Sequence, residues 1–169
     1  MTGRTLLFPL AVVEGIHLAE LIDQLTGVLT DADTGSDAAV ERLTPGAYPD
    51  DAEASAEFHH ATRTDLLDRR RADAASVRRA LESLLVTAPE DLVGDEGIEE
   101  RDVLISEHDV DAWLRTLTTL RLVIATRLNI TAADDEHDLE NPRFHVYDWL
   151  GYRLDGLVAL ADAQDEESF

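Results

Sequence analysis

The sequence predicts a mainly α-helical, single-domain bundle of about five to six helices with a small two-stranded β ribbon. Apolar residues recur at helical spacing along most of the 169 residues. Two short apolar stretches, about 4–10 and 102–106, lack this period and are candidate strands. Both tryptophans and two of the three tyrosines fall in 111–129 and 147–152, so we expect these two segments to carry the core.

The N-terminal part contains a candidate strand, a long helix and a short helix. Pro9 favours an edge position for the strand, because proline cannot donate to a sheet ladder. From residue 12 to residue 30 the apolar residues repeat at helical spacing. After a polar loop, a short helix over 37–43 is expected to end before the turn signal Pro45-Gly46.

Two further helices are predicted in the middle of the chain. The first spans about 51–61, with Asp50 or Asp51 as its N-cap. The second begins at Thr62 or Thr64 and reaches about residue 86. An acidic, glycine-containing linker follows over 90–101.

The C-terminal part supplies the last two helices. Ser106 and Asp109 resemble a capping box that opens a helix reaching about residue 129. An acidic loop and Pro142 precede a final helix over about 143–163. We therefore assign residues 1–163 to one helical domain and residues 164–169 to a flexible acidic tail.

Charge restricts the classes of partner. The chain has 36 acidic residues against 14 basic ones, all arginine, for a net charge of −22. A strongly negative surface repels phosphate backbones and anionic membranes, so both are disfavoured partners. The basic cluster of Arg69 to Arg71 with Arg78 and Arg79 has acids at helical spacing, which predicts an ion-paired helix. A transcriptional regulator binding DNA through this local arginine surface is an alternative.

The sequence contains no recognisable catalytic motif. It has no cysteine, no Gly-x-Ser-x-Gly elbow and no phosphate-binding glycine loop. We therefore expect no enzyme activity and no cofactor. No apolar run is long enough to span a bilayer and the N-terminus does not resemble a signal peptide, so a cytoplasmic protein is expected.

A metal site in the 134–145 loop is a second alternative to an interaction role. His137 and His145, with the acids near them, offer nitrogen and oxygen ligands. No histidine pair has the spacing that places two ligands on one helix face. The preferred interpretation is a solvated acidic loop without a metal.

An arginine interrupts the most regular apolar stripe. On the helix after Ser106, one face carries Trp113, Leu117, Arg121, Ile124 and Leu128. A buried guanidinium needs a carboxylate or several carbonyls, and Asp148 lies between two aromatic residues on the last helix. We predict that Arg121 and Asp148 form a structural polar lock between the two helices. The functional alternative is an anion- or peptide-binding pocket at the same junction.

Several segments together resemble a family of actinobacterial proteins of unknown function, usually encoded beside the Clp protease adaptor. The resemblance begins at Arg42-Leu-Thr-Pro-Gly and is strongest at Trp113-Leu-Arg-Thr-Leu and Leu120-Arg-Leu-Val-Ile. The signature residues are Trp113, Leu117, Arg121, Arg127, Tyr147, Asp148, Trp149 and Gly151. Where the family tends to carry an Asn-Asp pair, this chain has Thr118-Thr119.

The resemblance implies a cytoplasmic protein whose gene neighbours concern proteolysis and sulfur assembly. Some relatives are labelled transcriptional regulators, a label that the net charge disfavours. It implies no catalytic residues. The favoured function is a non-enzymatic protein–protein interaction or adaptor module with an unknown protein partner, and a homo-oligomer is compatible with it.

Overall fold

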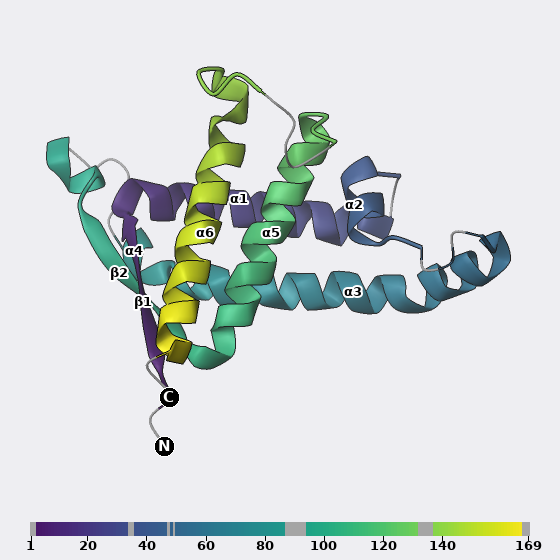
Figure 1. Ribbon diagram of the computed structural model, residues 1–169, viewed down its shortest axis with the longest axis horizontal. Coiled ribbons are helices and arrows are strands. Elements are labelled where there is room, and N and C mark those ends of the chain that lie inside the picture. Colours follow the sequence, from purple (N-terminus) through teal and green to yellow (C-terminus); the bar gives the residue numbers. More distant parts are fainter. Residues whose placement is uncertain are drawn as a thin grey trace.

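Two crossed pairs of helices form the body of the protein in the computed structural model (Figure 1). The structure describes residues 3–33, 36–46, 48, 50–86, 94–131 and 137–166. The elements are β1 (Thr5–Ala11), α1 (Val12–Thr30), α2 (Ala38–Leu43), α3 (Ala52–Ala80), α4 (Glu82–Leu85), β2 (Glu100–Ser106), α5 (Val110–Arg127) and α6 (His145–Glu166). Helices α5 and α6 lie side by side across α1 and α3. The predicted mainly helical fold with a small ribbon is confirmed.

The β ribbon covers one end of the helices. Strands β1 and β2 pair antiparallel from Thr5↔Ser106 to Ala11↔Glu100. Alternate residues of β1 are buried, as a ribbon with one face on the core requires. The buried Phe8 ring lies edge-on to Trp113 of α5, with 5.7 Å between ring centroids. The ribbon therefore packs directly on the segment that the sequence marks as the core.

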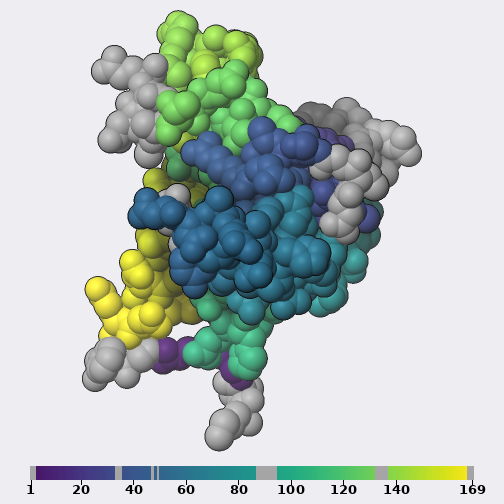
Figure 2. Space-filling model, turned by 90° about the vertical axis from the view of Figure 1, so that its right-hand side faces the viewer, coloured from purple at the N-terminus to yellow at the C-terminus, as the bar shows by residue number. Residues whose placement is uncertain are grey.

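Helix α3 replaces two predicted helices with one. We expected a break near residue 62, with Thr62 or Thr64 as an N-cap, but the helix is continuous from Ala52 to Ala80. The Thr62 hydroxyl donates to the carbonyl of Phe58 at 2.8 Å, one turn back, so it does not cap a new helix. Helix α3 ends at Ala80, and after Leu81 the short helix α4 begins at Glu82. Figure 2 shows how α2 and the first turns of α3 (blue) form the surface at this end.

The predicted cap at the start of α5 also differs in the structure. Instead of the reciprocal capping box, the Ser106 hydroxyl donates directly to the Asp109 carboxylate at 2.6 Å. Ser76 of α3 donates to the same carboxylate at 2.8 Å, so Asp109 ties the start of α5 to α3. These hydrogen bonds, from Ser106 first, hold the pKa of Asp109 below its ordinary value.

The last helix continues into the segment assigned to a tail. Helix α6 reaches Glu166, three residues past the predicted end of the domain. The Gln164 side chain donates to the carbonyl of Thr5 at 3.2 Å, and the Gln164 carbonyl accepts from Arg4. These contacts with β1 explain why the helix persists. Only 167–169 of the predicted tail lie outside the described residues.

A half-buried carboxylate joins the first and last helices. Glu14 of α1 accepts hydrogen bonds from Arg153, from Trp149 Nε1 at 2.6 Å and from the backbone nitrogen of Ala11 at 3.0 Å. Burial alone would raise the pKa of Glu14, but the hydrogen bonds from Arg153 and Trp149 outweigh it and hold the pKa below 4.5. The hydrogen bond from the Ala11 nitrogen also satisfies a backbone donor at the start of α1 that has no partner within the helix.

Replacing Glu14 is expected to destabilise the fold. Glu14→Gln should lower the free energy of unfolding by about 2–3 kcal/mol at pH 7, because Arg153 loses its charged partner while remaining largely buried. Since the folded-state pKa of Glu14 lies below its ordinary value, this contribution is complete above about pH 4.5 and is lost as the pH falls through the folded-state pKa. Urea unfolding at pH 7, 5 and 3 measures the difference.

The matched control is Glu20→Gln on the same helix. The Glu20 side chain is 64% exposed and lies 3.8 Å from His17. Its replacement should change stability by no more than about 0.5 kcal/mol. An equal loss in both variants would contradict the role given to Glu14.

Candidate functional site

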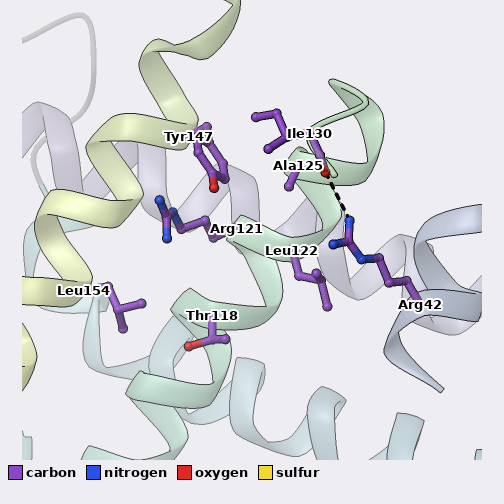
Figure 3. Close-up of a pocket in the computed structure, with 8 residues that line it drawn as sticks. All are labelled: Arg42, Thr118, Arg121, Leu122, Ala125, Ile130, Tyr147 and Leu154. Carbon is purple, nitrogen blue, oxygen red and sulfur yellow. Dashed lines mark hydrogen bonds between the residues drawn. The ribbon is translucent and has the colours of Figure 1, made fainter. Parts of the chain in front are cut away.

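One face of α5 forms the floor of a groove between α6 and α2 (Figure 3). Thr118, Arg121, Leu122 and Ala125 share this face, because residues three and four apart lie together on a helix. The walls are Tyr147 and Leu154 from α6, Arg42 from α2 and Ile130 after α5. The cavity measures about 210 Å³. We call it the α5 groove.

Arg121 lies between α5 and α6, held by a ring and a glycine. Its guanidinium carbon is 4.2 Å from the centroid of the Tyr147 ring. On the next turn of α6, a Cβ built on Gly151 would lie 3.2 Å from three atoms of the same guanidinium. The Nε atom is buried and has no hydrogen-bond partner. Tyr147 and Gly151 therefore form a slot that fits one guanidinium and leaves no room for another side chain.

The structure does not bring Arg121 and Asp148 together as a polar lock. Within the described part of the chain, Asp148 accepts hydrogen bonds from His137 Nε2, at 2.8 and 3.1 Å, and Arg121 has no carboxylate within ion-pair distance. Adjacent residues on a helix point about 100° apart, so Tyr147 and Asp148 cannot both face α5. The aromatic ring occupies the position that we assigned to the carboxylate.

The other signature residues hold the surrounding elements together. Trp113 and Leu117 are buried in the core. Arg127 forms a two-bond ion pair with Asp37, the N-cap of α2, at 3.0 and 2.7 Å. This pair lowers the pKa of Asp37. Trp149 donates to Glu14, as described above. The signature therefore describes the junction of α5 with α6 and α2.

A second groove adjoins the first on the same helix. It is lined by Leu43, Arg70, Leu114, Arg115, Thr118, Thr119 and Leu122, and it measures about 230 Å³. Thr118 and Leu122 belong to both grooves. Arg70 of α3 donates to the Leu43 carbonyl at 2.9 Å and lies 3.5 Å from the Thr119 hydroxyl. Desolvation by burial lowers the pKa of Arg70.

Sequence reasoning did not identify Arg70 as an inward-facing residue. The triplet Arg69 to Arg71 resembles a solvated face because acids surround it in the sequence. The only available signal was the helical phase of Leu67, Ala74 and Val77, which are buried on the same helix. Arg70 lies three residues after Leu67 and four before Ala74 in sequence, so it borders that buried face.

Most other arginines near α3 are already engaged. Arg71 pairs with Asp68, an acid at the helical spacing that predicts an ion-paired helix. Asp73 binds Arg115 rather than Arg69, at 2.8 Å, and Arg78 binds Asp23 of α1 rather than Glu82, at 3.0 Å. These interhelical pairs stabilise the packing of α3 on α5 and α1. They leave less free positive charge for a phosphate backbone.

The two grooves stand out from the rest of this acidic chain. Neither contains an aspartate or glutamate among its lining residues. Arg42 contacts only neutral acceptors among the described residues, namely the Ile130 carbonyl at 3.4 Å and the Thr126 hydroxyl at 3.3 Å. Arg42, Arg70 and Arg121 thus bring three guanidinium groups to the two grooves along α5, and among the described residues none of the three has a carboxylate within ion-pair distance. These grooves are suited to bind carboxylates.

The predicted 134–145 metal loop lies partly outside the described residues, which omit 132–136. His137 contacts Asp148, whereas His145 lines a different, apolar groove beside Trp149. Across the described ranges, no three His, Asp or Glu residues are grouped closely enough to hold a metal ion. None of the described helices is both long and apolar enough to cross a membrane.

Gly151→Ala should test the arginine slot. A glycine-to-alanine change inside an exposed helix usually stabilises by about 0.5–1 kcal/mol. We expect that gain at Gly156, where an added Cβ meets no atom within 4 Å. At Gly151 the gain should vanish or reverse, because the new methyl group presses on Arg121. Thermal unfolding of both variants measures this, and equal gains would contradict the slot.

The contact of Arg121 with the Tyr147 ring gives a second prediction. Tyr147→Leu should lower the free energy of unfolding by about 1–2 kcal/mol, since a largely desolvated cation–π contact is lost. Tyr147→Phe keeps the ring and should stay within about 0.5 kcal/mol of the wild type. Urea unfolding followed by tryptophan fluorescence compares the two. A similar loss in both variants would assign the effect to the hydroxyl instead.

Comparison with known proteins identifies the family of the chain. Searches of curated proteins and of solved structures find no match for the chain. The family model described as a domain of unknown function, DUF2017, matches residues 1–161, which include all of the grooves described above. The chain therefore belongs to the DUF2017 family.

Proposed function

We propose that this protein is a non-enzymatic interaction module that holds an acidic group of a protein partner in the α5 groove. One observation carries the proposal: Arg42 and Arg121 line a groove in which no described residue is acidic, in a chain of net charge −22. The buried Arg121 Nε has no hydrogen-bond partner among the described residues, which is costly unless an acceptor is supplied. A partner carboxylate supplies it.

The groove offers binding groups rather than reacting groups. Guanidinium groups bind carboxylates through charge-assisted hydrogen bonds, and the Thr118 hydroxyl can donate or accept. Leu122, Ile130 and Leu154 provide apolar contacts around them. Among the described residues, no histidine or carboxylate lines the groove to act as a general base. This combination favours recognition over catalysis.

Net charge shapes how such a partner would bind. The whole protein repels an acidic partner at long range, whereas the groove attracts it at short range. Affinity should therefore depend on close contact, and raising the salt concentration should weaken both effects. We place the protein in the cytoplasm. Its resemblance to proteins encoded beside the Clp protease adaptor supports a partner in proteolysis, and a second copy of the chain is the alternative partner.

Partner capture should depend on the groove arginines. We expect the double variant Arg42→Gln, Arg121→Gln to lose the protein partner that the wild type retains on co-purification from its host, measured by cross-linking and solution mass. Arg78→Gln is the matched control, because Arg78 pairs with Asp23 away from the groove. Both proteins must show wild-type helicity for the comparison to hold.

Two results would decide against the proposal. If the double variant retains the partner at the wild-type level, the α5 groove does not take part in the interaction. Recovery of DNA as the retained partner, with loss of binding in Arg78→Gln, would favour the regulator alternative.

A further inference from the structure

We propose that the partner segment is an extended acidic peptide with two carboxylates, the first bound at Arg121 and Arg42 and the second at Arg70 and Thr119. This inference rests on the proposed function and specifies its ligand. The peptide backbone would cross α5 over Thr118 and Leu122, the two residues common to both grooves. The two grooves would then be one continuous binding surface.

The second subsite is a partly buried guanidinium with no carboxylate within ion-pair distance among the described residues, although the charge of Asp73, which pairs with Arg115, also acts on it. Arg70 is held by a neutral carbonyl and a distant hydroxyl, and its Nε atom is buried without a partner. The neighbouring Arg115 is already paired with Asp73. A carboxylate entering beside Thr119 would therefore find Arg70 as its nearest unpaired cation in this groove.

The spacing of the subsites selects an extended segment. Arg121 and Thr119 lie on opposite flanks of α5, so a ligand reaching both must cross about 10 Å, the width of a helix. An extended chain advances about 3.3 Å per residue. Two acids about three to four residues apart fit this distance. Leu122 lies between the subsites, so an apolar residue between the acids matches the surface.

Short capped peptides test the inference directly. Fluorescence anisotropy with the full chain would compare peptides that carry two aspartates separated by two or three residues with adjacent-aspartate, single-aspartate and uncharged versions. We expect the spaced pair to bind about tenfold more tightly than the single aspartate, because a second charge-assisted contact forms. The dianion of a linear dicarboxylic acid of similar length should bind at least tenfold more weakly than the peptide.

Two variants identify the second subsite. Arg70→Gln should abolish the advantage of the second aspartate and leave binding of the single-aspartate peptide unchanged. Thr119→Asp should do the same, because the new carboxylate lies beside Arg70. Thr119 is 4% exposed, so thermal unfolding of this variant separates loss of binding from loss of folding. Arg78→Gln should retain the wild-type preference.

The outcomes separate this inference from the proposed function. Equal binding of single- and double-aspartate peptides, or an unchanged preference in Thr119→Asp, would overturn the second subsite while leaving the α5 groove intact. Failure of every acidic peptide to bind would overturn both. Binding of the free dianion as tightly as the peptide would replace the peptide with a small-molecule ligand.

Discussion

The approach of α5 to α6 depends on one guanidinium. Arg121 occupies the space between the helices, where Tyr147 covers one side and the absence of a side chain at Gly151 opens the other. A larger residue at 151 would force the helices apart, and a smaller one at 121 would leave a cavity between them. The α5 groove adjoins this contact, and Arg121 and Tyr147 form part of its lining.

The distribution of charge follows from packing as much as from composition. Arginines that join helices receive carboxylates: Arg153 meets Glu14, Arg127 meets Asp37 and Arg115 meets Asp73. Among the described residues, Arg42, Arg70 and Arg121 in the two grooves do not, even though acids outnumber bases by more than two to one. We propose that this contrast gives a strongly acidic protein a local site for carboxylates.

The fold could be predicted further than the site. Apolar periodicity located α1, α5 and α6 because one stripe of each helix is buried, and the ribbon was visible as two non-helical apolar runs. The break expected at Thr62 was wrong because threonine can bond back within a helix as readily as cap one. At the junction, the sequence identified Arg121 but not its partners. Whether Tyr147 or Asp148 faces Arg121 depends on how α6 is rotated about its own axis. The sequence pattern does not specify that rotation.

The contact of Glu14 with Arg153 spans 139 residues of sequence. During synthesis at about 5–20 residues per second, the first strand and helix must wait on the order of ten seconds for the residues that complete their packing. In that interval Leu6, Phe8 and Leu10, which the finished protein buries, have neither β2 nor α6 to cover them. Until β2 and α6 are made, we expect this apolar strand to be open to pairing with another chain.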